Sequence, residues 1–182
     1  GWKRCRTSPA LFYKRCSVSG KLQVLVSYVD DIAAAMSPVD PDNLWDNLRK
    51  QGWIFSEQGQ LKRFVGINIH RINSRQFHLE QKEYSEQVVT KFEERHKDEF
   101  PNGIRGRRTV PNVPPTPSDE PREFDGARTD IGGIAYAARG TRPDICHACN
   151  RLAACANRWS QSATEFRDAI MAYIKGTSGY RL

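Results

Sequence analysis

Residues Ser27–Ala35, Ser-Tyr-Val-Asp-Asp-Ile-Ala-Ala-Ala, place two adjacent aspartates between two apolar runs. The runs, Leu22–Val29 and Ile32–Met36, are short and apolar, so they predict a β-hairpin with Asp30 and Asp31 in its tight turn. Two adjacent negative charges are costly unless a cation neutralises them, and Mg²⁺ binds carboxylate oxygens together with substrate phosphates. The stretch therefore predicts either a magnesium site suited to phosphoryl or nucleotidyl transfer, or a simple turn, in which aspartate is common.

The segment before residue 82 is dominated by short apolar runs bounded by turn residues, which indicate β-strands. One amphipathic helix interrupts them. Asp40 is placed to cap this helix, Pro41 stands at its first helical position, and Gly52 ends it. Besides the two runs of the hairpin, the predicted strands are Leu11–Tyr13, Phe64–His70 and Phe77–Leu79.

After residue 82 the apolar residues recur every three or four positions, which is the spacing of one helix face. Between the first two helical stripes, residues 109–121 are rich in proline, which excludes a helix and favours an extended spacer; a ligand for another domain is the alternative. The sequence thus predicts an α+β protein, with strands and one helix in residues 1–81 and only helices in residues 82–182. The stripes are Tyr84, Val88 and Phe92; Ile131, Ile134 and Ala138; Ile145, Cys149, Leu152 and Ala156; and Phe166, Ile170, Tyr173 and Ile174.

Composition restricts the class of protein. With 182 residues, 38% of them hydrophobic, the chain has material for one fair core or two small ones. No apolar run approaches the ~20 residues that a membrane span needs, so we expect a soluble intracellular protein. The first methionine is Met36, which indicates a piece of a longer polypeptide. The net charge of +7 favours polyanionic partners, although a basic solvated surface explains it equally well.

The five cysteines are an odd number, and three of them share one predicted helical segment, so we expect free thiols rather than a disulfide framework. Cys146-His147-Ala148-Cys149 has the spacing of half a zinc site. Because no second pair stands at ligand spacing, these thiols are expected to be core residues.

Tyr28-Val29-Asp30-Asp31 is similar to the YxDD box of reverse transcriptases. Other segments resemble, in the same order, boxes of the copia-type retrotransposon polymerases. The YxDD box alone is weakly specific, whereas Thr-Arg-Pro-Asp-Ile and Tyr-Ile-Lys-Gly-Thr at this spacing favour that family. The resembling segments are Gly1–Tyr13, Gln60–Ile69 with Leu79–Tyr84, Arg128–Tyr136 with Thr141–Ile145, and Tyr173–Thr177.

The resemblance implies a fold and a set of site residues. Residues 1–81 would form the C-terminal part of a reverse-transcriptase palm, with the YVDD hairpin and a primer-grip-like hairpin. Residues 82–182 would form a helical thumb-like region with a proline-rich linker at 109–121. Asp30 and Asp31 would be catalytic carboxylates that bind Mg²⁺ or Mn²⁺, and Tyr28 would contact the primer end. The primer-grip-like residues would be Phe64, Val65, Gly66 and Ile67, and the possible phosphate contacts Lys62, Arg63, Arg71 and Arg142.

The implied function is RNA-directed DNA synthesis, in which dNTPs extend a primer on an RNA or DNA template by two-metal nucleotidyl transfer. The family takes a third carboxylate from a strand well upstream of the YxDD box, and none precedes Ser27 here, so we expect the isolated chain to be inactive. The resemblance implies an intracellular location, either cytoplasmic and particle-associated or nuclear. The alternative is a non-catalytic remnant or recruited module that binds nucleic acid or a protein partner and keeps the aspartates only as a turn.

Overall fold

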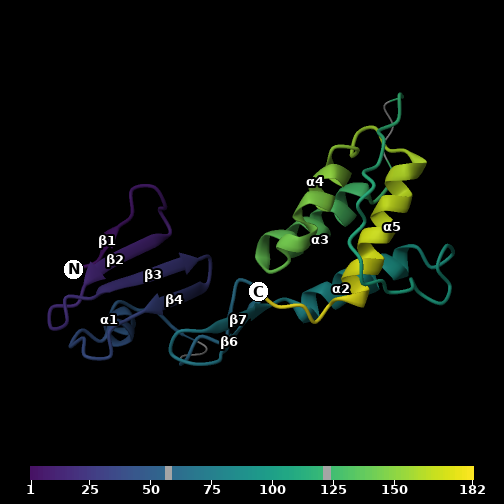
Figure 1. Ribbon diagram of the computed structural model, residues 1–182. Helices are drawn as coiled ribbons and strands as arrows, with labels where there is room; N and C mark the ends of the chain where they lie inside the picture. Colours follow the sequence, from purple (N-terminus) through teal and green to yellow (C-terminus); the bar gives the residue numbers. More distant parts are fainter. Residues whose placement is uncertain (56–58, 121–123) are drawn as a thin grey trace. The chain divides into compact units, whose positions relative to one another are not determined.

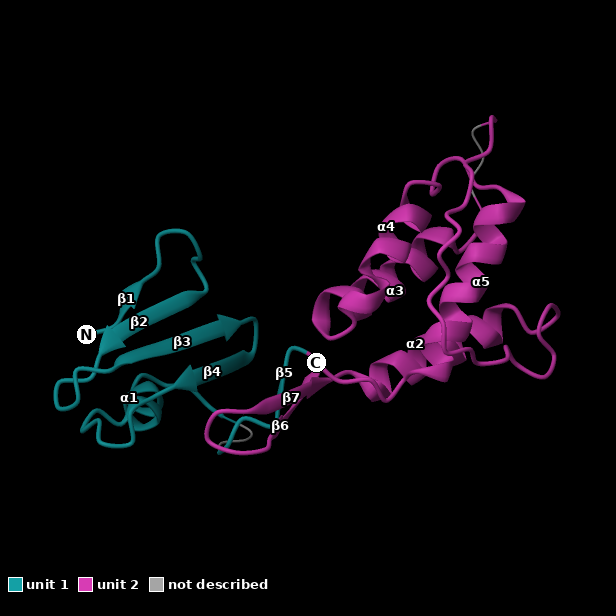
Figure 2. Ribbon diagram, in the orientation of Figure 1, with its two compact units in different colours: residues 1–65 teal, residues 66–182 magenta. Residues whose placement is uncertain are grey.

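The computed structural model describes residues 1–55, 59–120 and 124–182. The chain divides into two compact units, a first unit of residues Gly1–Val65 and a second unit of residues Gly66–Leu182 (Figure 2). None of the helices in the described ranges is long and apolar enough to cross a membrane.

The first unit contains a four-stranded antiparallel sheet in which each strand pairs with the next along the chain (Figure 1). The two central strands run where the apolar runs predicted them, and the hairpin strands pair from Val24 opposite Ala35 to Tyr28 opposite Asp31. The short first strand was not predicted, because it holds only two residues, both charged. The strands are β1 (Lys3–Arg4), β2 (Leu11–Arg15), β3 (Leu22–Tyr28) and β4 (Asp31–Ala35), and a further two-residue strand, β5 (Arg63–Phe64), lies near the end of the unit.

One face of this sheet is buried and carries a polar cluster. Lys14 and Gln23 are opposite one another on β2 and β3, and both are buried. The Lys14 ammonium pairs with Asp40 at 2.8 Å and with Asp42 at 2.9 Å, and the Gln23 amide donates to Asp40. A buried lysine is tolerated here because its charge is paired. Since Asp40 and Asp42 lie in the loop before the helix, these contacts also fix that loop to the sheet.

The helix of the first unit, α1 (Leu44–Lys50), begins later than the sequence predicted. Asn43 caps it, with its side-chain oxygen accepting from the Asp46 N–H at 3.2 Å. Asp40 was predicted to be the cap. That prediction was wrong because Asp40 is held by the buried Lys14, a partner that local sequence cannot reveal.

The Asp40 contacts make the stability of the first unit depend on pH. The hydrogen bond from Lys14 lowers the pKa of Asp40 from 3.8 to about 2. A carboxyl with a depressed pKa in the folded state stabilises that state above its unfolded pKa, and this contribution is lost as the pH falls through the folded pKa. We therefore expect the unfolding free energy of the first unit to fall as the pH is lowered from about 4 to about 2.

The measurement is urea unfolding of the whole chain, followed through NMR amide signals of β2 and β3. Asp40→Asn is expected to be less stable than the parent at neutral pH and to lose much of this pH dependence. Asp46→Asn, which removes an exposed carboxylate on α1, is the control and is expected to keep the parent profile. Identical profiles for the parent and Asp40→Asn would contradict the assignment.

The second unit begins with a hairpin and continues as helices (Figure 1). Its two strands pair in antiparallel register from Asn68 opposite Glu80 to Arg71 opposite Phe77. The predicted change from strand to helix near residue 82 is confirmed. In the described ranges, all the regular elements that follow this hairpin are helical. The elements are β6 (Ile67–Arg71), β7 (Phe77–Glu80), α2 (Lys82–Arg95), α3 (Ala127–Gly140), the 3₁₀ turn η1 (Pro143–Ile145), α4 (Cys146–Ala153) and α5 (Gln161–Gly176).

The core of the second unit is built from the four predicted apolar stripes. Phe92 of α2, Ile134 of α3, Leu152 of α4 and Ile170 of α5 are fully buried in one cluster. Removing such side chains from water is the main favourable term in folding. The helical periodicity of the sequence therefore identified the core correctly.

The proline-rich segment is part of this unit and not a free spacer. The Ser160 hydroxyl, at the N-terminus of α5, donates to the Thr116 carbonyl at 2.6 Å, and the Thr116 N–H donates to Ser162 at 3.0 Å. Pro111 and Pro115 are buried. As predicted, residues 109–120 contain no helix, but they are docked on the start of α5. The last residue of the predicted spacer, Pro121, lies outside the described residues.

The hairpin of β6 and β7 belongs with the helices. Leu79 and Leu182 exchange two backbone hydrogen bonds of 3.0 Å each, and Arg181 donates to Glu80 at 2.9 Å. The compact units consequently divide at residue 65, whereas the secondary structure changes type at residue 82.

Candidate catalytic hairpin

The two-residue turn of the β3–β4 hairpin is formed by Val29 and Asp30, because Tyr28 pairs with Asp31. The sequence had placed the turn one residue later, at Asp30 and Asp31. Two-residue hairpin turns need a positive φ at their first central position, and Val29 has φ 50°. Asp31 is therefore the first residue of β4, and only Asp30 is in the turn itself.

The conformation of Val29 is unfavourable for its residue type. A β-branched residue in the left-handed region costs roughly 1–2 kcal/mol. Its side chain is 82% exposed, so packing of that side chain does not offset the cost. Such backbone outliers cluster at functional sites, so the conformation of Val29 marks the hairpin tip as a candidate functional site.

The side chains at the tip are accessible. Tyr28 is 56% exposed, and both Asp30 and Asp31 are exposed. One carboxylate oxygen of Asp31 accepts a long hydrogen bond, 3.4 Å, from the N–H of Val65, which also has a positive φ, 48°. The first unit thus brings the predicted metal-binding acid against the predicted primer-grip segment.

The donor set at the tip fits a metal that completes its coordination elsewhere. Within the described ranges, no group of three or more His, Cys, Asp or Glu side chains is placed to hold a metal ion. Mg²⁺ is commonly bound through one or two carboxylates, with substrate phosphates and water supplying the remaining oxygens. Asp30 and Asp31 are suited to that partial role and not to a closed protein cage.

The four predicted primer-grip residues are half-buried and fall on both sides of the unit boundary. Phe64 and Val65 end the first unit, and Gly66 and Ile67 begin the second. Gly66 has φ 72°, and a Cβ added to it would lie 2.7 Å from the Tyr136 hydroxyl of α3. A side chain at this position would therefore be strained by the backbone and would require Tyr136 to shift.

Three of the four predicted phosphate contacts are exposed, namely Lys62, Arg63 and Arg71. Arg71 also lies over the Phe77 ring at 5.8 Å and donates to the Asn73 carbonyl at 3.3 Å. Both contacts leave its guanidinium at the surface.

The fourth predicted phosphate contact, Arg142, is corrected by the structure. Its side chain is 1% exposed. It donates to the Asp144 carboxylate at 2.8 and 3.0 Å and to the Thr177 hydroxyl and carbonyl at 2.7 and 3.1 Å. A guanidinium fully used inside the fold is not accessible to a nucleic-acid backbone.

This Arg142 cluster joins two of the segments that carried the family resemblance. Arg142 and Asp144 belong to the Thr-Arg-Pro-Asp-Ile segment, and Tyr173 and Thr177 are the first and last residues of the Tyr-Ile-Lys-Gly-Thr segment. The Tyr173 hydroxyl donates to Asp144 at 2.8 Å, and Arg142 lies over its ring at 5.3 Å. Burial alone raises the pKa of Asp144, but hydrogen bonds from Arg142 and Tyr173 outweigh it and hold the pKa below its usual value.

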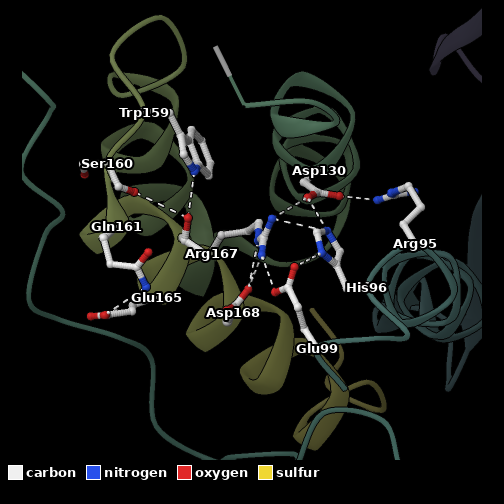
Figure 3. Close-up of polar contacts among 11 residues, drawn as sticks. Arg95, His96, Glu99, Asp130, Trp159, Ser160, Gln161, Glu165, Arg167 and Asp168 are labelled. Carbon is white, nitrogen blue, oxygen red and sulfur yellow. Dashed lines mark hydrogen bonds and ion pairs between the residues drawn. The ribbon is translucent and has the colours of Figure 1, made fainter. Parts of the chain in front are cut away.

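A second buried ion network lies between α2, α3 and α5 (Figure 3). Arg167 is 0% exposed and lies between the rings of Phe92 and Phe124, at 5.0 and 4.9 Å. It pairs with Asp168 at 2.7 Å and faces Asp130 at 3.6 Å. Burial raises the pKa of Asp168, although Arg167 beside it acts in the opposite direction.

The Asp130 carboxylate is buried on α3 and has two arginines and one histidine as neighbours. Arg95 of α2 donates to it, Arg167 faces it, and the His96 ring nitrogen lies 3.8 Å from it. The network therefore neutralises a buried carboxylate and links three helices. It was not predicted, because a single arginine or aspartate in a helical stripe gives no local sign of burial.

The cysteines were expected to be free thiols packed in the core. All five are free. Cys149 is buried, and burial raises the pKa of its thiol, while the Cys146 thiol lies 3.4 Å from the Ala138 carbonyl. Both are packed within the helical unit, as expected.

An exposed basic segment that was not predicted as a site lies between α2 and α3. Arg105, Arg107 and Arg108 lie within four residues and all are exposed. The three arginines are visible in the sequence as a local basic run. Whether such a run can serve as a binding site depends on how the fold holds its backbone.

Comparison with known proteins supports one distant relationship. No protein-family model matches the sequence, and no solved structure matches it significantly. The sequence is 26% identical over 182 aligned positions to the retrovirus-related Pol polyprotein from transposon TNT 1-94 of Nicotiana tabacum. The alignment covers 95% of this chain and 13% of that polyprotein. The chain is therefore distantly homologous, over nearly its whole length, to a part of a copia-type retrotransposon Pol polyprotein.

Proposed function

We propose that this chain is the part of an RNA-directed DNA polymerase that carries the YxDD box, the primer grip and the thumb. The observation that carries the proposal is the hairpin tip, where two adjacent exposed carboxylates stand at a strained turn and Asp31 is hydrogen-bonded to Val65. The distant homology to a Pol polyprotein supports it. Because the chain spans 13% of that relative, the complete activity belongs to a longer polypeptide.

Each element has a role in this proposal. Asp30 and Asp31 hold Mg²⁺ or Mn²⁺, and Tyr28 contacts the primer end. When bound, the metal would activate the attacking oxygen and stabilise the leaving one. Residues 64–67 hold the 3′ end of the primer, and the helices of the second unit lie along the template–primer duplex. The isolated chain does not extend primers, because two carboxylates alone cannot position both metals.

The test is photo-cross-linking of a primer that carries a thionucleotide at its 3′ end, annealed to an RNA template. We expect cross-links to fall in the peptides that contain residues 22–35 and 63–71, with a yield that rises with Mn²⁺. The double variant Asp30→Asn/Asp31→Asn is expected to lose the Mn²⁺ dependence. A primer-extension assay on the same complex is expected to show no synthesis.

The control removes two exposed carboxylates of the second unit, with Asp98→Asn/Asp125→Asn. It is expected to keep both the cross-link positions and the Mn²⁺ dependence. Cross-links confined to the second unit, with no response to Mn²⁺, would contradict the catalytic proposal. They would favour the non-catalytic alternative, a nucleic-acid-binding remnant whose aspartates form only a turn.

A further inference from the structure

We infer that Arg105, Arg107 and Arg108, here called the arginine segment, form a binding site for the phosphate backbone of nucleic acid. This inference deepens the proposed function by naming a surface of the second unit that would hold the duplex, and it rests on that function only for the identity of the duplex.

The arginine segment is a concentration of uncompensated positive charge. All three side chains are exposed, and none pairs with an acidic side chain in the part of the chain that the structure describes. Within the described residues, the one side-chain hydrogen bond of these three arginines is from Arg107 to the Thr109 hydroxyl, at 3.1 Å. The nearby Glu93 does not neutralise them, because Lys175 occupies its carboxylate at 2.7 Å.

The backbone of the segment is fixed to the helical unit. Before it, Ile104 is buried, and its N–H donates to the Glu93 carboxylate at 2.8 Å. Within it, the Arg107 N–H donates to the Ala172 carbonyl of α5 at 2.9 Å. The arginines are therefore presented from a held backbone and not from a loose loop, which reduces the ordering cost of binding.

Two glycines allow this close docking. A Cβ built on Gly176, the last residue of α5, would lie 2.1 Å from the Arg107 carbonyl oxygen. A Cβ on Gly106 would lie 3.1 Å from the Gly176 Cα. The segment and the end of α5 are thus in backbone contact, where a side chain on Gly176 has no room.

The chemistry of the segment favours a phosphate backbone over a protein interface or a membrane surface. Guanidinium groups bind phosphate in a bidentate, planar arrangement. A protein interface needs buried apolar or aromatic anchors, and a membrane-surface site needs an apolar face. Residues 102–109 contain one large apolar side chain, Ile104, and it is buried in the core. Charge and hydrogen bonds alone are sufficient for sequence-independent binding of nucleic acid.

The experiment measures binding of the whole chain to a fluorescent RNA–DNA hybrid by anisotropy at two salt concentrations. The test variant is Arg105→Gln/Arg107→Gln/Arg108→Gln. The charge-matched control is Arg75→Gln/Arg139→Gln/Arg151→Gln, which replaces three other exposed arginines of the second unit. Each variant lowers the net charge from +7 by three, to +4.

If the three arginines neutralise three phosphates, the slope of log K against log salt is expected to become shallower by about 2–3 in the test variant. The affinity at the lower salt concentration is expected to fall about tenfold or more. The control is expected to change the slope by less than about 1. Equal losses in the two variants would overturn the inference, since overall charge and not this segment would then govern binding.

Two further arms keep the result decisive. Unlabelled duplex is expected to compete with the probe, whereas polyglutamate of the same charge is expected not to; equal competition would overturn the assignment to nucleic acid.

If circular dichroism shows that the triple variant has lost helix, the single variants Arg105→Gln and Arg108→Gln replace it, and each is expected to reduce the slope by about 0.9. Unchanged slopes in both would overturn the inference.

The failure of this inference is distinguishable from that of the proposed function. Loss of the Mn²⁺-dependent cross-links at the hairpin, with normal dependence of binding on the arginine segment, would remove the catalytic proposal alone. Normal cross-links, with the same slope of log K against log salt in the parent and in the arginine variants, would remove this inference alone.

Discussion

Arg167→Ala is expected to lower the free energy of unfolding of the second unit by about 3–5 kcal/mol. The substitution removes a fully buried cation from beside Phe92 and Phe124. It leaves the buried carboxylate of Asp130 and the half-buried carboxylate of Asp168 with fewer partners. Removing one member of a buried ion pair is much more costly than replacing the whole pair with apolar groups. Urea unfolding, followed by far-ultraviolet circular dichroism and by the NMR signal of the Trp159 indole N–H, measures the change.

The matched control is Arg151→Ala, because Arg151 is exposed on α4. It is expected to change the unfolding free energy by less than about 0.5 kcal/mol. Trp159 is a local reporter, since its ring stacks on Phe124 at 5.5 Å and Phe124 in turn lies over Arg167. Arg167→Ala within about 1 kcal/mol of the parent would show that the network contributes little to stability.

Arg142→Ala is expected to destabilise the second unit by a similar amount, about 3–5 kcal/mol. Its guanidinium supplies hydrogen bonds to both Asp144 and Thr177, so truncation leaves a partly buried carboxylate and a buried hydroxyl without these donors. The same urea measurement applies. If Arg142 instead served mainly as a surface phosphate contact, the substitution would leave stability unchanged.

Arg142→Lys separates geometry from charge. Lysine keeps the positive charge but cannot bind Asp144 in a bidentate way while also reaching Thr177. We therefore expect it to recover less than half of the lost stability. Arg139→Ala, at an exposed position on α3, is the control and should remain close to the parent. Full recovery by lysine would show that charge, and not the planar fork, is what the site requires.

The sequence predicted the type of most elements because their patterns are strong. Alternating or continuous apolar runs located β2, β3 and β4, and apolar stripes of helical spacing located α2 to α5. Even the change from strand to helix at Lys82 could be predicted, because the repeat itself changes there. These features depend on local periodicity, which a single sequence contains.

The errors concern choices between partners. Asp40 was a good candidate for a helix cap, but the buried Lys14 holds it instead. Arg142 was a plausible phosphate contact, but Thr177, 35 residues later, takes its donors. In both cases the local residue type allows two uses, and only the tertiary fold decides between them.

The candidate site was predicted in part. The hairpin and the exposure of its two acids followed from the sequence, but the turn was placed one residue late because a valine with positive φ is not an expected turn residue. The hydrogen bond from Val65 to Asp31 joins positions 34 residues apart, so no local pattern could indicate it.

The contacts between the first and last elements of the second unit affect how it folds. Helical proteins fold fast when their contacts are local, and they slow down when contacts join residues that are far apart in sequence. Arg181 reaches Glu80 across 101 residues, and Ser178 reaches Glu86 across 92. Closing such loops costs conformational entropy before any contact forms, although this cost grows only slowly with loop length. During synthesis on the ribosome, the β6–β7 hairpin would therefore wait without its partner until residues 178–182 had emerged, and chaperones would meet the helical unit in this open state.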